Sequence, residues 1–160
     1  MNTFEEKQKF SNWILWPLTL LLVPIGSFIC YGIYQQMILG EPFGDKPGSD
    51  LSLILVTILL LGLPLFFWTL YLKTEMDHQR IQLHFFPFLR REIQWSEVSN
   101  FEIVQYGFVG GWGVRISSKY GTVYNAQGNI GLALQLNNGK KVLIGTQKRA
   151  ELERFLKNIA

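Results

Sequence analysis

The stretch from Phe85 to Arg91 reads Phe-Phe-Pro-Phe-Leu-Arg-Arg and combines apolar bulk with two adjacent arginines. Aromatic and basic side chains together suit the interface between a membrane and water. Each basic residue near an anionic leaflet contributes about 1 kcal/mol to binding. The alternative is that the phenylalanines belong to a core and the arginines are ordinary solvated charges. The candidate contacts with lipid headgroups are Lys73, Arg80, Arg90 and Arg91.

A second group of candidates consists of large side chains that could anchor a partner. Residues 107–113 are rich in glycine, but no Lys-Ser/Thr pair follows and the next segment is an expected strand. We therefore interpret this stretch as a loop or bulge and not as a phosphate-binding loop. Trp112 within it is either a core residue or an exposed anchor. The candidate partner surface comprises Phe86, Phe88, Trp112 and Arg115.

Residue types that perform catalysis or bind metals are sparse in this sequence. It has two histidines: His78 lies in an expected turn, and His84 lies on the outward face of an expected strand. We interpret both as solvated surface residues and not as a metal pair. The single cysteine, Cys30, excludes an internal disulfide and lies in an apolar segment away from water. Acidic residues show no spacing typical of general acid–base catalysis, so we expect no enzyme, no metal and no cofactor.

The composition places these residues in a chain that is unusually apolar. Of 160 residues, 48% are hydrophobic and 17% are charged, whereas globular proteins have about 25% charged residues. The mean hydropathy is +0.15. Abundant aromatic residues exclude a disordered chain. The net charge of +3 is too small to indicate nucleic acid, which we do not expect as a partner.

Two long apolar segments, at about residues 13–39 and 51–72, are typical of membrane-spanning helices. Residues 51–72 contain no charge and would make roughly 33 Å of helix, enough to cross a hydrocarbon core of about 30 Å. A cleaved signal peptide is excluded by the length of the first apolar run and by the lack of a cleavage site. We expect residues 1–72 to form an N-terminal segment and a transmembrane helical hairpin, with a turn at residues 40–50.

The orientation of this hairpin follows from the distribution of lysine and arginine. An excess of these residues marks the cytoplasmic side of a membrane protein. The connecting turn holds one basic residue, Lys46, whereas the flanks hold Lys7, Lys9, Lys73, Arg80, Arg90 and Arg91. We therefore expect a multi-pass protein of the cell inner (plasma) membrane with both termini in the cytoplasm.

Residues 73–160 show the period-two alternation that predicts half-buried antiparallel strands. The pattern occurs at residues 81–85, 92–95, 101–103, 114–116 and 132–136. One hairpin can be given a register. A three-residue loop at residues 137–139 pairs Leu136 with Lys140 and places Ile144 opposite Leu132, which keeps the apolar side chains on one face. Gly139 supplies the left-handed residue at the end of this loop.

A helix is expected from about Gln147 to Asn158, with Thr146 as its N-cap. Leu152, Phe155, Leu156 and Ile159 form one apolar stripe, which we expect to cover an open end of the strand domain. Glu153 and Lys157 are spaced for a favourable pair on the outer face.

Several motifs together resemble a known family. Short strands followed by one helix are similar to the pleckstrin-homology-like (PH-like) fold. A membrane hairpin leading into residues 74–77 (TEMD), 80–81 (RI) and 89–93 (LRREI) resembles bacterial PH-like membrane proteins. The runs at residues 111–115 (GWGVR), 124–131 (YNAQGNIG) and 144–148 (IGTQK) are similar to one subgroup of them. The resemblance implies an α+β fold in which a two-span hairpin precedes a PH-like antiparallel β-barrel or sandwich capped by a C-terminal helix. The Lys and Arg-x-Arg pattern of phosphoinositide-binding PH domains is not matched.

These observations lead to two hypotheses about function. The first is an integral membrane protein whose cytoplasmic domain, residues 73–160, is a membrane-tethered binding or scaffolding module. Its partners would be the lipid bilayer and a membrane or cytoplasmic protein, and it could also form a homo-oligomer. The alternative is a sensor of a small ligand or lipid, with a pocket in the barrel or between the spans. A deep apolar pocket would favour the sensor, and an exposed apolar patch would favour the scaffold.

Overall fold

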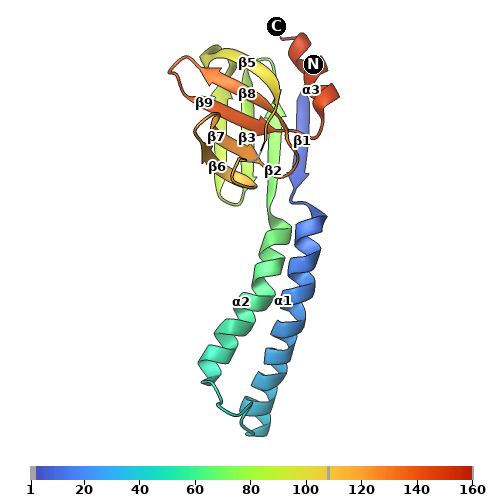
Figure 1. Ribbon diagram of the computed structural model, residues 1–160, viewed down its shortest axis with the longest axis vertical. Helices are drawn as coiled ribbons and strands as arrows, with labels where there is room; N and C mark the ends of the chain where they lie inside the picture. Colours follow the sequence, from blue (N-terminus) through green and yellow to red (C-terminus); the bar gives the residue numbers. More distant parts are fainter. Residues whose placement is uncertain (1–2, 108, 160) are drawn as a thin grey trace. The chain divides into compact units, whose positions relative to one another are not determined.

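A computed structural model describes residues 3–107 and 109–159 (Figure 1). The chain divides into two compact units. The helical unit is Ser11–Thr69, and the sheet unit combines the N-terminal residues up to Phe10 with the residues from Leu70 onward. This division differs from the expected boundary after residue 72, because a strand near the N-terminus belongs with the sheets.

The helical unit is an antiparallel pair of apolar helices. Helix α1 (Asn12–Ile33) continues as a π-helical segment, η1 (Tyr34–Leu39), and α2 is Asp50–Thr69. Both are long and apolar enough to cross a membrane, and most of their side chains are exposed. The second helix ends three residues earlier than expected, because Tyr71 and Leu72 pair within a strand.

Small and polar side chains hold these two helices together. A Cβ atom at Gly26 would lie 2.7 Å from a methyl carbon of Leu61, so glycine permits the close approach of α1 and α2. The indole Nε1 of Trp68 donates a hydrogen bond to Oγ1 of Thr19 at 3.0 Å. Trp16 and Trp68 are in edge-to-face contact at 5.6 Å, so aromatic side chains of the two helices meet at this end of the hairpin.

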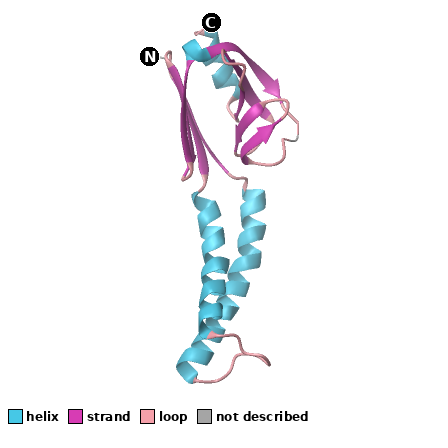
Figure 2. Cartoon of the chain, turned by 90° about the vertical axis from the view of Figure 1, so that its left-hand side faces the viewer, coloured by secondary structure: helices cyan, strands magenta, loops and turns pink. Residues whose placement is uncertain are grey.

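The sheet unit contains two sheets that form separate layers (Figure 2). The four-stranded sheet is antiparallel and has the order β1 (Phe4–Lys9), β2 (Tyr71–Met76), β3 (Arg80–Phe86) and β4 (Leu89–Gln94). A 3₁₀ turn, η2 (Trp95–Glu97), leads into the second sheet. That sheet has the order β5 (Val98–Gln105), β8 (Ile130–Leu136), β9 (Lys141–Gly145), β7 (Gly121–Asn125) and β6 (Gly113–Ser117). Its β7–β9 pair is parallel, so the sheet is mixed and not purely antiparallel.

Strand β1 was not expected from the sequence. Its inner face carries Phe4, Glu6 and Gln8, so two of the three buried positions are polar and the apolar alternation is absent. The carboxylate of Glu6 accepts hydrogen bonds from Oγ1 of Thr146 at 2.6 Å and from the amide of Gln147 at 2.7 Å. Gln8 donates from Nε2 to the carbonyl oxygen of Gly145 at 2.7 Å. These contacts attach the N-terminal strand to the end of β9 and to the two residues that follow it.

The core lies between the two sheets and is completed by α3 (Arg149–Lys157). Alternate residues of β2, β3 and β8 fill it, and in β3 and β8 their burial follows the predicted period of two. The predicted β8–β9 register is confirmed, with Leu132 opposite Ile144. Gly139 has a φ of 80°, as its loop position requires. The buried apolar residues include Leu72, Ile81, Leu83, Ile93, Leu134, Val142, Leu152, Phe155 and Leu156.

Three predictions about the C-terminal helix are corrected in detail. The helix begins at Arg149 and not at residue 147. Thr146 is not its N-cap, because its hydroxyl donates to Glu6 and accepts the amide hydrogen of Lys148. Glu153 pairs with Arg149 at 2.6 Å, one turn earlier than the expected Lys157. The stripe of Leu152, Phe155 and Leu156 is buried as predicted.

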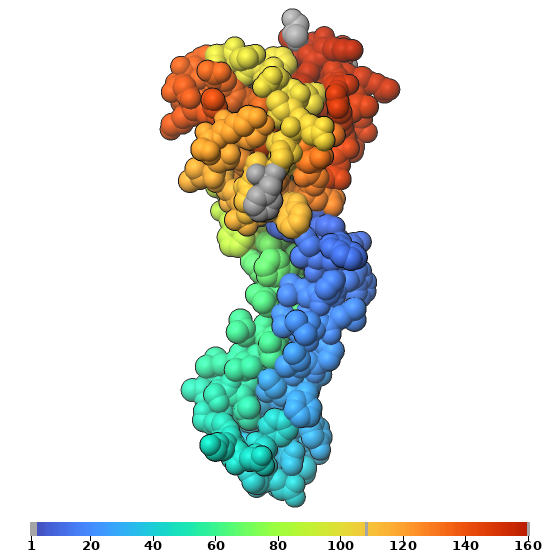
Figure 3. Space-filling model, in the orientation of Figure 1, coloured from blue at the N-terminus to red at the C-terminus, as the bar shows by residue number. Residues whose placement is uncertain are grey.

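Strand β6 is more exposed than its alternation predicted. Val114 and Ile116 are 38% and 91% exposed. Both lie opposite β7 residues on the face that β7 turns toward the core, through the pairs Val114–Tyr124 and Ile116–Thr122. Because β6 is the last strand of its sheet, the core does not extend far enough to cover it. The segment containing β6 is visible on the surface of the sheet unit (Figure 3, orange).

Candidate functional site on the four-stranded sheet

The outer face of the four-stranded sheet carries every second side chain of β1 to β4. The strands are paired so that these side chains align in rows that cross the sheet. Three of these rows form the candidate site. The aromatic row is Lys9, Tyr71 and Phe86; the basic row is Lys7, Lys73, His84 and Arg90; the acidic row is Glu5, Glu75, Gln82 and Glu92.

The aromatic row lies at the end of the sheet where β1 finishes and β2 begins. The rings of Tyr71 and Phe86 are stacked, with centroids 5.1 Å apart and planes 3° from parallel. His84 approaches Tyr71 and Phe86 edge-on, at 5.7 Å and 5.9 Å. The ammonium group of Lys7 lies 3.9 Å from the centre of the Tyr71 ring, a cation–π contact. The aromatic and basic rows are therefore in direct contact.

In the basic row, Lys73 bridges two carboxylates. Its Nζ lies 2.9 Å from Oε1 of Glu5 and 2.7 Å from Oε1 of Glu75. Hydrogen bonds to Glu75 and Glu5 raise the pKa of Lys73 well above its usual range. Lys73 therefore stays positively charged at any physiological pH and links the basic row to the acidic row.

His84 and Arg90 form the other half of the basic row. Nε of Arg90 donates to Nε2 of His84 at 3.4 Å, which requires that nitrogen of the imidazole to be unprotonated. Desolvation lowers the pKa of His84, and the positive charges of Arg90 and Lys73 lower it further. His84 is thus a neutral acceptor between two cations in the free protein.

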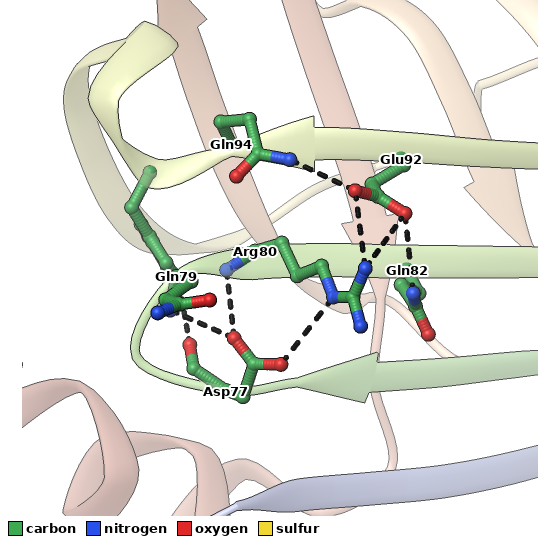
Figure 4. A network of polar contacts seen from close by, with 7 residues as sticks. Asp77, Gln79, Arg80, Gln82, Glu92 and Gln94 are labelled. Carbon is green, nitrogen blue, oxygen red and sulfur yellow. Dashed lines mark hydrogen bonds and ion pairs between the residues drawn. The ribbon is translucent and has the colours of Figure 1, made fainter.

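The acidic row continues into a polar network at the far end of the sheet (Figure 4). The guanidinium group of Arg80 lies 3.5 Å from Asp77 and 3.4 Å from Glu92. Gln82 and Gln94 donate to the same Glu92 carboxylate at 3.2 Å and 2.8 Å. Asp77 accepts the backbone amides of Gln79 and Arg80, which lower its pKa. Arg80 is therefore held by protein carboxylates.

A surface hollow of about 470 Å³ lies over the basic and acidic rows. Its lining brings positive and negative groups together, and its one apolar residue is Leu83, whose side chain faces the core. The charged and polar lining residues are Lys73, Glu75, Gln82, His84, Arg90, Arg91 and Glu92. The composition of this hollow suits a small polar ligand with charge of both signs.

The structure separates the four residues predicted to contact headgroups. Lys73 and Arg90 lie in the basic row, but Arg80 belongs to the network around Glu92. Arg91 is on the inner face and donates to the hydroxyl of Tyr124 at 3.0 Å. The reason is that residues 89–94 form strand β4, so adjacent arginines point to opposite faces.

Sequence reasoning missed two members of the basic row. His84 was interpreted as an isolated solvated residue, and Lys7 lies in the strand that was not foreseen. To predict β1 from the sequence, one would have had to pair Lys7 with Lys73. The local alternation of polar and apolar residues does not indicate this pairing. The four residues of the row come from four strands, β1 to β4, and meet only through strand register.

The candidate partner surface is brought together only in part. Phe88 is 66% exposed and stacks on Phe85 at 6.3 Å, and Phe85 also approaches Gly113. This places Phe88 near the start of β6, where Trp112 is 42% exposed. Trp112 is therefore not a core residue. The Nε of Arg115 donates to the carbonyl oxygen of Trp112 at 3.1 Å, whereas Phe86 lies apart in the aromatic row.

Comparison with protein-family models finds no match for the chain, and a search of curated proteins finds none at a significant level. Within residues 3–107 and 109–159, no group of three or more His, Cys, Asp or Glu side chains is arranged to hold a metal ion.

Proposed function

We propose that this chain is an integral membrane protein with two transmembrane helices and a non-enzymatic, membrane-tethered binding module that contacts lipid headgroups. The observation that carries the proposal is the basic row of Lys7, Lys73, His84 and Arg90 in contact with the aromatic row. Aromatic rings next to basic side chains are the usual composition of protein surfaces at the membrane–water interface.

The covalent connections support a location close to the membrane. Leu70 is the single residue between α2 and β2, and Phe10 and Ser11 are the two residues between β1 and α1. Tyr71 and Lys73 thus follow the end of α2 by two and four positions. A domain tethered this tightly meets headgroups at a high effective concentration, so weak contacts are sufficient to orient it.

The pairing of β1 with β2 supports one topology. Lys9 is paired with Tyr71, so the chain entering α1 and the chain leaving α2 are neighbours in one sheet. Both ends of the hairpin must then lie on the same side of the membrane. We place that side in the cytoplasm of an inner (plasma) membrane, because the basic residues flanking the hairpin outnumber the single Lys46 of its connection.

We also propose that the sheet unit is related to PH-like domains of bacterial membrane proteins. The support is the arrangement of two packed sheets followed by one helix whose apolar stripe enters the core. Strand β1 and the parallel β7–β9 pair are additions to the antiparallel pattern that the resemblance implied.

The proposal is tested by reconstituting the full chain in vesicles with and without anionic lipid and measuring hydrogen exchange across β2 to β4. We expect anionic lipid to slow exchange in the wild type, and the effect to be lost in Lys7→Glu/Arg90→Glu. The matched control is Arg80→Glu, which changes a charge on the same face outside the basic row. If all three proteins exchange alike with and without anionic lipid, the outer face does not bind headgroups.

A further inference from the structure

The three rows of the outer face are arranged in a fixed chemical order. Along β2, starting from the end of α2, the outward residues are aromatic (Tyr71), cationic (Lys73) and anionic (Glu75). Strand β3 runs in the opposite direction and places the aromatic Phe86, the titratable His84 and the uncharged polar Gln82 in the same three rows. Residues two apart on a strand are about 6.8 Å apart. The spacing between adjacent rows is therefore about the size of one small functional group.

This order matches the order of groups in an aminophospholipid. From the bilayer outward, such a lipid presents its apolar chains, a phosphate and then a primary ammonium group. We propose that the outer face binds a phosphoethanolamine headgroup, with its phosphate at Lys73, His84 and Arg90 and its ammonium at Glu75. The inference rests on the proposed membrane-facing function and names the headgroup that this function would select.

The phosphate half of the site has the required donors. Lys73 supplies a permanent positive charge, and the guanidinium group of Arg90 has five N–H donors, of which Nε points to His84. Phosphate bound here would offset the repulsion that Lys73 and Arg90 exert on a protonated imidazole. His84 can then change from an acceptor into a third donor.

The ammonium half has acceptors at the correct distance along the strand. Glu75 lies next to Gln82 in the acidic row, and both line the same hollow as the phosphate-binding side chains. In the free protein, Glu75 accepts from the ammonium group of Lys73 at 2.7 Å. The free structure therefore already contains an amine bound to Glu75, which the amine of the ligand would replace.

Binding is an exchange of ion pairs. The phosphate takes the place of Glu75 at Lys73, and the ligand ammonium takes the place of Lys73 at Glu75. Exposed ion pairs such as Lys73–Glu75 contribute little net stability, so opening this one costs little. The ligand brings no net charge to the site, and the exchange is less sensitive to salt than docking on an anionic surface.

Glu75 also provides selectivity among phospholipids. A primary ammonium donates hydrogen bonds to a carboxylate, whereas the trimethylammonium of a choline headgroup has no N–H to donate. A glycerol headgroup offers no positive charge to Glu75 and brings a net negative charge to the site. The expected affinity is therefore highest for ethanolamine headgroups, and anionic glycerol headgroups bind more weakly, through the basic row alone.

In the test, the full chain in detergent is titrated separately with short-chain phosphatidylethanolamine, phosphatidylcholine and phosphatidylglycerol. Binding is measured from the NMR signal of the His84 imidazole. We expect the ethanolamine lipid to bind about tenfold more tightly than the choline lipid, the difference expected for charge-assisted hydrogen bonds. Glu75→Gln should remove this difference, and Glu75→Asp should retain it. Glu102→Gln on β5 is the control, because Glu102 is exposed on the other sheet.

Each alternative result overturns the inference in a recognisable way. Equal affinity of the wild type for ethanolamine and choline lipids would show that the site binds the phosphate but does not recognise the primary ammonium group. Tightest binding of phosphatidylglycerol would favour a simple anionic-surface contact, so the proposed function would stand and this inference would fail. An arm with soluble glycerophosphoethanolamine identifies the source of the headgroup: affinity equal to that of the lipid would assign a free metabolite and overturn the lipid assignment.

Discussion

At the scale of single residues, the charge state of His84 depends on desolvation and on the charged groups around it. It faces Lys73 and Tyr71 on β2, Arg90 on β4 and Phe86 on its own strand. The negative charge of Glu75 acts against these two cations and raises the pKa of His84. The outcome is an imidazole that resists protonation, in a row that would otherwise carry one more positive charge.

We predict that Arg90→Gln raises the pKa of His84 toward its ordinary value of 6.5. A histidine whose pKa is lowered on folding binds fewer protons in the folded state, so stability falls as pH decreases from about 6.5 through the folded pKa. Arg90→Gln should therefore reduce the loss of stability in mildly acidic solution. An NMR titration of His84 in the full chain measures the shift, and Arg80→Gln should leave it unchanged.

A second residue-scale prediction concerns Glu6, which is 3% exposed. Glu6→Ala leaves the Thr146 hydroxyl and the Gln147 amide without this acceptor, and losing a buried partner costs about 1–3 kcal/mol. Glu5→Ala on the exposed face of the same strand should change the free energy of unfolding by less than about 0.5 kcal/mol. Denaturant unfolding of the full chain in detergent compares the two, and equal effects would mean that Glu6 does not secure β1.

At the scale of elements, α3 closes the core through Phe155, which is 4% exposed and lies 6.3 Å from Phe4 of β1. We predict that Phe155→Ala lowers the free energy of unfolding by about 3–5 kcal/mol. Arg154→Ala, one residue earlier on the exposed side of the helix, is the control and should have little effect. A thermal midpoint unchanged by Phe155→Ala would show that α3 does not stabilise the sheets.

The sequence was informative wherever burial follows a simple period. Strand β3 and the β8–β9 hairpin alternate cleanly, because Ile81, Leu83, Leu132 and Leu134 face one apolar core. Strand β1 could not be predicted in this way, because Glu6 and Gln8 face inward to satisfy groups near Gly145 and Thr146. For the same reason, only part of the candidate site was predicted from the sequence. Lys73 and Arg90 were identified, but the row that joins them to Lys7 exists only through the pairing of β2 with β1.

At the scale of the whole molecule, the sheet unit is built from both ends of the helical hairpin. Because Lys9 and Tyr71 are paired neighbours, a short turn can replace residues 11–69. We predict that residues 3–10, joined by a Gly-rich turn to residues 70–159, form a folded soluble domain, and that residues 74–159 alone are much less stable. Circular dichroism and thermal unfolding of the two fragments test this; equal stability would mean that β1 contributes little.

The proposed topology makes a prediction at the same scale. A reporter enzyme that is active only outside the cytoplasm should be inactive when fused after residue 159 and active when inserted in the connection at residues 41–49. The expectation rests on the placement of lysine and arginine on the flanks of the hairpin. The reverse pattern of activity would invert the topology, and activity at both positions would show that the hairpin does not span the membrane twice.

The pairing of β1 with β2 also sets a condition on biosynthesis. The ribosome makes β1 first, but its partner strand emerges only after the entire helical hairpin. Until then Glu6 and Gln8 have no partners, since Thr146 and Gly145 are synthesised near the end of the chain. If the hairpin inserted only once, or one proposed span remained outside the bilayer, β1 and β2 would be left on opposite sides of the membrane and the sheet could not form. If the hairpin spans the membrane as proposed, insertion of both helices is a condition for β1 and β2 to pair, and a chain with only one helix inserted would expose unpaired strands to quality-control proteases.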